Sequence, residues 1–143
     1  MFKTLLCAAA TAAFAFSPVG AIAQGHTNAM VKSPPAAPYK AVSSLVKLPD
    51  FLPGMGQLFV DPNTLPAGPF LAYDHDGKLV STIYMLPLAA LKPEMKLDNL
   101  KTAGGTVDHV DVVYNAGHPG VGEPHIHVVL WHVPAAQEAR VAK

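Results

Sequence analysis

The strongest constraint on the fold is an alternation of residue types in two segments near the end of the chain. In residues 106–114 and in residues 125–133, every second residue is of a similar type, so that two kinds of residue alternate along each segment. A loop rich in glycine and proline, residues 115–124, joins the two segments. Such a period of two is typical of β-strands, whose successive side chains point to opposite faces of a sheet. We therefore predict two antiparallel strands, each with one face toward a core.

One face of each predicted strand is more apolar than the other. The more apolar faces contain Val110, Val112 and Tyr114 in the first strand and Ile126, Val128 and Leu130 in the second. If both apolar faces pack in one core, Asp111 is expected opposite His127, and His109 opposite Val129. This register leaves the histidines on the solvent or interface face.

The polar residues of the two strands would then lie together. At roughly 5 to 8 Å between Cβ atoms, they are close enough to share one ion after side-chain adjustment. Imidazole and carboxylate groups suit divalent Zn, Cu, Ni, Mn or Fe. With a histidine of the connecting loop included, the predicted metal ligands are His109, Asp111, His118, His125 and His127. We assign no catalytic residue and expect no organic cofactor.

The remaining pattern also favours β-structure. Residues 57–60 predict a short strand, and residues 70–73 and 78–86 predict a hairpin around an Asp-Gly turn. Residues 88–100 and 135–143 are expected to form short helices, the first interrupted by Pro93. The expected fold is α+β but β-rich: a small antiparallel sheet or open barrel with one or two short helices.

The N-terminal residues predict export. A basic start, an apolar alanine-rich run and the small residues 21–23 indicate a signal peptide over residues 1–23, cleaved after Ala23. Residues 24–44 are polar and then rich in proline and alanine, so we predict a flexible arm followed by a single β-rich domain, residues 45–143. No later stretch is long and apolar enough to span a bilayer. The mature protein is expected to be periplasmic or secreted, with no membrane span.

Composition excludes several classes of function. The only cysteine, Cys7, lies in the predicted signal peptide, so disulfides, thiol catalysis and thiolate-bound zinc are excluded from the mature protein. The formal net charge is zero, and no basic stripe marks a nucleic-acid surface. Charged residues make up 14% of the chain against 50% hydrophobic residues, which indicates that another subunit covers part of the surface in a homo-oligomer.

The residues before the last predicted strand are similar to the first metal motif of cupins. Gly120-Val-Gly-Glu-Pro124 precedes His125-Ile-His127, as glycine and proline precede His-x-His in that family. A cupin would also supply a glutamate several residues later and a second motif with another histidine. This chain has Leu130, Trp131 and His132 there and ends soon afterwards, so the match to a cupin is partial.

Two longer segments resemble a small family of uncharacterised exported bacterial proteins that carry a domain of unknown function. The segments are residues 74–88 and residues 115–125, which contain a Gly-His-Pro and then a Pro-His signature. The resemblance covers about residues 53–133 and implies a sheet-rich α+β domain capable of self-association. The family pattern has an acidic residue two positions after the second histidine and a further histidine two beyond that. This chain has His127 and Val129 there, so only His118 and His125 are carried over.

Three functions remain open from the sequence. The first is an exported protein that binds a divalent metal or a small polar ligand at its histidine cluster, without turnover. The second is a metal-dependent enzyme on a cupin-like barrel. The third is a structural homo-oligomer whose polar histidine face packs against a neighbouring subunit and holds no metal.

Overall fold

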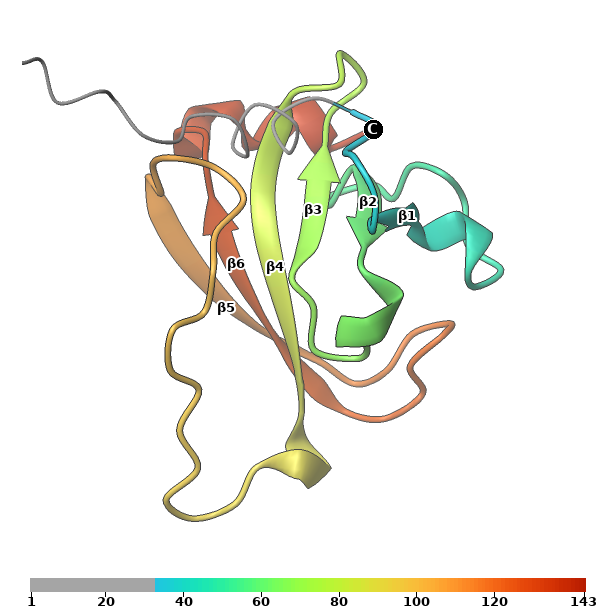
Figure 1. Ribbon diagram of the computed structural model, residues 1–143. Helices are drawn as coiled ribbons and strands as arrows, with labels where there is room; N and C mark the ends of the chain where they lie inside the picture. Colours follow the sequence, from blue (N-terminus) through green and yellow to red (C-terminus); the bar gives the residue numbers. More distant parts are fainter. Residues whose placement is uncertain (1–32) are drawn as a thin grey trace, which may run out of the picture.

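A computed structural model describes residues 33–143 of the chain. These residues form a single antiparallel sheet of six strands in the order β1-β2-β3-β4-β6-β5, shown in Figure 1. The strands are β1 (Lys40–Ala41), β2 (Gln57–Val60), β3 (Phe70–Tyr73), β4 (Leu79–Pro87), β5 (His109–Asn115) and β6 (His125–Trp131). The helical turns are all 3-10: η1 (Val42–Ser44), η2 (Pro62–Thr64), η3 (Leu88–Ala90) and η4 (Ala135–Val141).

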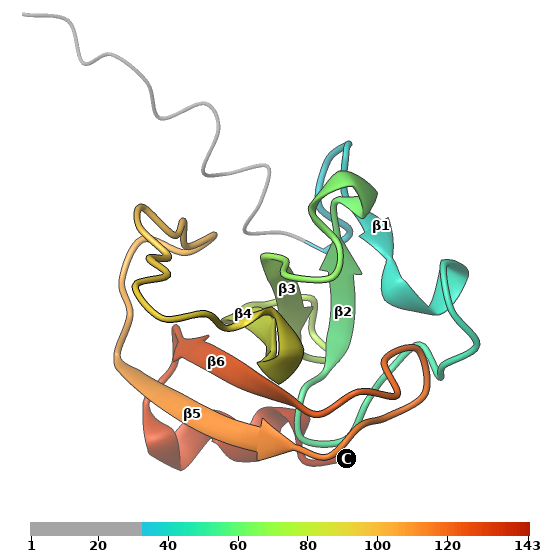
Figure 2. The same cartoon turned by 90° about the horizontal axis from the view of Figure 1, so that it is seen from below.

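This architecture confirms the predicted β-rich fold with an open antiparallel sheet. The sheet is strongly twisted, so that β2 runs across the direction of β5 and β6 when it is seen from below (Figure 2). The predicted signal peptide and the first residues of the predicted arm lie outside the described residues. The last residues of that arm, 40–44, form β1 and η1. Among the residues described, no helix is both long and apolar enough to cross a bilayer.

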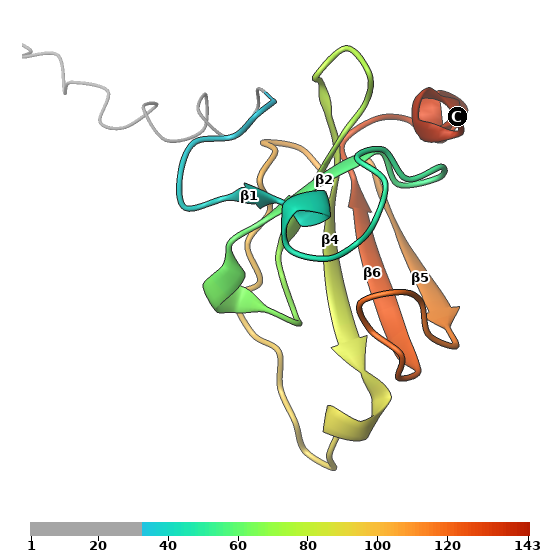
Figure 3. The same cartoon turned by 90° about the vertical axis from the view of Figure 1, so that its right-hand side faces the viewer.

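The predicted hairpin is confirmed as β3 and β4. Its turn is held by Asp74, whose carboxylate accepts backbone N–H bonds from Asp76 and Lys78, both at 2.9 Å. The buried Asp74 carboxylate also accepts a 2.6 Å bond from Arg140 of η4. The turn and η4 therefore lie at the same end of the sheet, as Figures 1 and 3 both show.

The predicted pairing of the last two strands is antiparallel, as observed, and groups the same side chains on each face, but its register is wrong. Asp111 lies opposite Val129, and Val113 lies opposite His127. The pairing is thus shifted by two residues from the predicted one. A shift of two leaves every side chain on the same face, so alternation alone does not distinguish the two registers.

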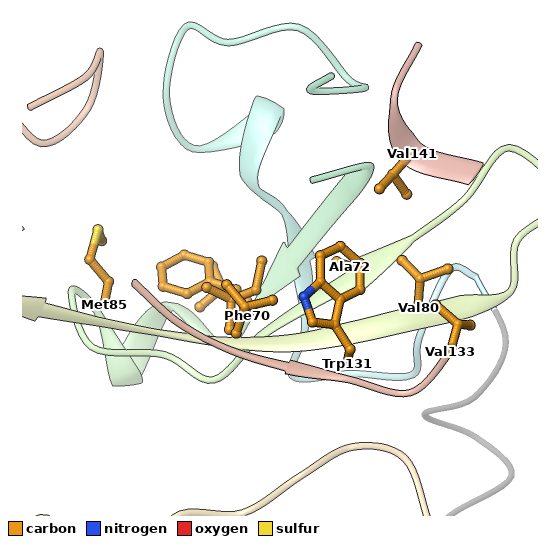
Figure 4. Packing of buried hydrophobic residues seen from close by; sticks show 10 residues of the cluster. Phe70, Ala72, Val80, Met85, Trp131, Val133 and Val141 are labelled. Carbon is orange, nitrogen blue, oxygen red and sulfur yellow. The ribbon is translucent and has the colours of Figure 1, made fainter. Parts of the chain in front are cut away.

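The prediction of which face is buried is wrong. His125, His127, Val129 and Trp131 are buried, whereas Val112 on the opposite face is 67% exposed. The reason is that η4 and residues 42–58 cover the histidine face. Figure 4 shows Val141 of η4 on the same side of the sheet as Trp131, in a cluster with Phe70, Ala72 and Met85. The indole and the valine of this face contribute apolar surface to the core, while hydrogen bonds join His125 to His127 and the Trp131 indole to Asp111.

The helix predicted over residues 88–100 is also wrong beyond its first turn. Only η3 is helical, and the rest of the connection to β5 is irregular. Pro93 lacks the N–H that a continuing helix needs, and Glu94 and Asn99 adopt positive φ angles of 65° and 58°. This connection extends past the sheet and returns along it (Figure 1), where the Tyr84 hydroxyl donates a 2.6 Å bond to the carbonyl of Lys101.

Candidate metal centre

Three of the five predicted ligands come together at one end of β6. His125 and His127 point from alternate positions of β6 to the buried face, and His118 reaches them from the β5–β6 loop. One ring nitrogen from each of the three lies within 4.8 Å of the others. The His118 ring centre is 4.8 Å from that of His125 and 5.7 Å from that of His127.

The loop holds His118 through its own short bridge. His118 and Val121 exchange two backbone hydrogen bonds of 2.9 Å, which closes a tight turn over Pro119 and Gly120. Gly120 takes a φ of 95°, in the left-handed region that glycine adopts without strain. The glycines and prolines that identified this segment as a loop in the sequence therefore also position a ligand.

Backbone carbonyls fix the proton positions of two of the histidines. His125 Nδ1 lies 2.7 Å from the carbonyl oxygen of Glu123, and His118 Nδ1 lies 3.0 Å from that of Pro119. Since a carbonyl only accepts, each Nδ1 carries a proton and donates it. The Nε2 atoms of both rings are left unprotonated, the state in which imidazole binds a metal.

The third histidine shares a hydrogen bond with the second. His127 Nε2 lies 3.0 Å from His125 Nε2, so His127 donates its Nε2 proton to the lone pair of His125. Burial first, and then repulsion from His125 and His118, lowers the pKa of His127 from 6.5 to about 4. The ring is therefore neutral at neutral pH, and no positive charge opposes the approach of a cation.

The spacing of the nitrogens fits a tetrahedral ion. Zinc binds imidazole nitrogen at about 2.0 to 2.1 Å, which places neighbouring nitrogens of a tetrahedral site roughly 3.3 Å apart. The His125–His127 pair already stands at 3.0 Å. The three nitrogens lie within 4.8 Å of one another, so His118 is the ligand that would move closer when an ion binds. His118 is also the one ligand of the three that lies on a loop.

The other two predicted ligands lie in a separate group. His109 and Asp111, on the same face of β5, meet Glu138 of η4, a residue that sequence reasoning missed. No spacing in the sequence connects Glu138 with β5, because the contact depends on how η4 folds back over the sheet. His109 Nδ1 lies 2.9 Å from the Asp108 carboxylate, and His109 Nε2 lies 3.0 Å from that of Glu138.

The bonds of this second group are those of an ion pair. Both ring nitrogens of His109 face carboxylates, which only accept hydrogen bonds, so the ring carries two protons and a positive charge. The bond from Asp108, opposed in part by desolvation and reinforced by Glu138, raises the pKa of His109 above its ordinary value. Asp111 in turn accepts a 2.9 Å bond from the indole of Trp131.

Fold and site together define a class: a small protein whose open antiparallel sheet carries three converging histidines at one end of its buried face. Residues 74–114 match the family model described as TTHB210-like, hypothetical protein TTHB210. The crystal structure of hypothetical protein TTHB210 from Thermus thermophilus is similar, with 44% sequence identity and a TM-score of 0.59. That match covers 66% of this chain and 93% of the other. The chain belongs to the TTHB210-like family. No curated protein matches the sequence.

Proposed function

We propose that the protein is an exported binder of a divalent transition metal, which it holds through His118, His125 and His127. The observation that supports this most directly is the pair of backbone hydrogen bonds that leave Nε2 of His118 and of His125 unprotonated. Carbonyl bonds to the distal nitrogen are the usual means by which proteins orient metal-binding imidazoles. On binding, the ion takes the place of the proton between His125 and His127, and His127 then carries its proton on Nδ1.

The three nitrogens leave a fourth coordination position open. Imidazole ligands favour Zn, Cu, Ni, Co or Fe over Mg and Ca, which prefer oxygen. We propose binding rather than turnover. We propose that His109 serves as an ion-paired contact between β5 and η4, and that Asp111 serves as the hydrogen-bond acceptor of Trp131, and that neither is a ligand.

Metal analysis of the purified chain tests this assignment. We expect about one zinc or cobalt ion per chain after incubation and desalting, lost in His118→Ala and in His127→Gln. His75→Ala is the matched control, because His75 is an exposed turn residue stacked on Phe51. Metal retained by His118→Ala but lost from His109→Gln would show that the second group is the site. No metal in the unaltered chain would refute the proposal.

Export is part of the proposal and has its own test. We expect the chain to be recovered from the periplasm or the medium with Gln24 as its first residue, as cleavage after Ala23 requires. N-terminal mass spectrometry of the fractionated protein measures this. A chain that retains residues 1–23 in the cytoplasm would contradict it.

A second candidate function, a structural homo-oligomer, is favoured by one observation. The face of β5 and β6 opposite the histidines leaves Val110 51%, Val112 67% and Tyr114 62% exposed. β5 is also an edge strand, with backbone groups free to pair with another chain. We propose that a second copy of the chain covers this apolar face.

Light scattering after size-exclusion chromatography tests the oligomer. We expect a mass that is a multiple of the chain mass, reduced by Val112→Lys. Leu65→Lys is the control, because Leu65 is 46% exposed in the β2–β3 connection, and β4 and β6 separate those strands from β5. A monomeric unaltered chain would exclude the oligomer without affecting the metal proposal.

A further inference from the structure

A cavity of about 220 Å³ lies beside the histidine cluster, on the buried face of the sheet. Leu58, Phe70, Ile83 and Met85 line it from β2, β3 and β4. Residues of the segment between η1 and β2, Leu48, Leu52 and Met55, line another side. The cavity is therefore a space left between the sheet and the segment that covers it.

Polar groups enter this cavity only from the β5–β6 end. Its polar side chains are His118, His127 and Asn115, and all its other lining residues are apolar. No aspartate, glutamate, lysine or arginine of the described chain lines it. A charged group on a bound molecule would thus find no partner along the apolar walls, where an unpaired charge is costly.

The charge of the metal site decides where a charged group would lie. Three neutral imidazoles leave a divalent ion with its full double positive charge, because none of them contributes an anion. Two of these imidazoles, from His118 and His127, line the cavity. An anionic oxygen donor in the fourth position would be held by the ion while the rest of the molecule extends along the apolar walls.

We propose that the cavity binds a small aromatic monocarboxylate, with its carboxylate on the metal and its ring among the apolar side chains. This inference rests on the metal site proposed above. The volume sets the size: an apolar cavity of about 150 Å³ accepts benzene, so a cavity of 220 Å³ accepts one ring with a short substituent.

Cobalt spectroscopy separates the two proposals. Co²⁺ replaces zinc, and its visible absorption reports both the tetrahedral site and any ligand that joins it. The protein is loaded with Co²⁺ and titrated with 4-methylbenzoate, with acetate, and with 4-methylbenzamide. We expect 4-methylbenzoate to change the Co²⁺ bands with a Kd at least about tenfold lower than that of acetate, because burial of the ring removes apolar surface from water. The amide, which lacks the carboxylate, is expected to leave the bands unchanged.

A variant that fills the cavity tests where the ring of the ligand lies. Leu52→Phe adds volume inside the cavity, and we expect it to weaken 4-methylbenzoate binding at least about tenfold while the Co²⁺ bands and acetate affinity stay unchanged. Leu130→Phe is the control, because Leu130 is half-buried on the opposite face of β6. Retained Co²⁺ bands in Leu52→Phe show that this variant is folded.

The outcomes distinguish the two failures. Tetrahedral Co²⁺ bands with equal affinity for 4-methylbenzoate and acetate, or with 4-methylbenzoate affinity unaffected by Leu52→Phe, would overturn the cavity proposal and leave the metal site standing. Absence of Co²⁺ bands in the unaltered chain would refute the metal site, and with it the carboxylate position that depends on the ion.

Discussion

Acid is expected to destabilise the metal-free protein through one residue, His127. Its pKa is 6.5 in the absence of neighbours and about 4 in the fold, first because it is buried and then because His125 and His118 repel its charged form. Between these two pH values the unfolded chain binds a proton that the folded chain does not. The contribution of His127 to the free energy of unfolding therefore falls as the pH falls, beginning near pH 6.5 and levelling off below pH 4.

The size of this loss follows from the two pKa values. Each pH unit between them corresponds to about 1.4 kcal/mol, so the loss from pH 7 to pH 4 is about 3 kcal/mol as an upper limit. His127 is only 8% exposed, so solvent screens little of this electrostatic effect. A domain of this size has a total stability of roughly 5 to 15 kcal/mol, which makes the effect measurable by denaturation.

Urea unfolding in the presence of a chelator at pH 7, 6, 5 and 4 measures the loss. We expect the unaltered chain and a His75→Gln control to lose about 3 kcal/mol more than His127→Gln over this range. His109 acts in the opposite sense: its raised pKa stabilises the fold at low pH, and that stabilisation is lost as the pH rises. Because His109 is present in all three proteins, the difference between them isolates His127. Parallel pH curves for the unaltered chain and His127→Gln would refute the reasoning.

Three further predictions concern stability. Val129→Asp should cost several kcal/mol of stability because it places an unpaired charge on the buried face, whereas Val128→Asp on the other face should cost about 1 kcal/mol. Thermal unfolding of the two variants measures this difference. A larger cost for Val128→Asp would mean that the other face of the sheet is the buried one. Arg140→Met should cost about 2 kcal/mol by leaving the buried Asp74 carboxylate without its cation, measured by urea unfolding at pH 7, and an unchanged midpoint would argue against the ion pair. Gly56→Ala should cost about 2 kcal/mol or more of stability, because φ is 89° at Gly56 and a Cβ there would collide with a carbonyl of β3. A variant with the original melting temperature would contradict this backbone conformation of Gly56.

The candidate site was partly predictable because two of its ligands follow from local periodicity. A His-x-His on a strand places both imidazoles on one face whatever the rest of the chain does. The loop histidine, His118, is close in sequence to both strands, and a short connection keeps it near them. The contact with Glu138 was not predictable, since it depends on where η4 packs. The separation of His109 from the cluster follows from the observed register, in which His109 lies opposite Trp131.

By itself, the sequence determined the strands and the fold class, because the alternation of residues and the glycine and proline turns act over a few residues. The hairpin around Gly77 and the antiparallel pairing of β5 with β6 both follow from such local signals. Tertiary structure alone decided which side of the sheet is the core. Both faces of β6 carry apolar residues, and the choice between them depended on segments distant in sequence, residues 42–58 and η4, which bury the histidines and leave Val112 exposed. The register of β5 was likewise decided by tertiary packing, because a shift of two residues keeps every side chain on the same face and the alternating pattern is the same for both registers.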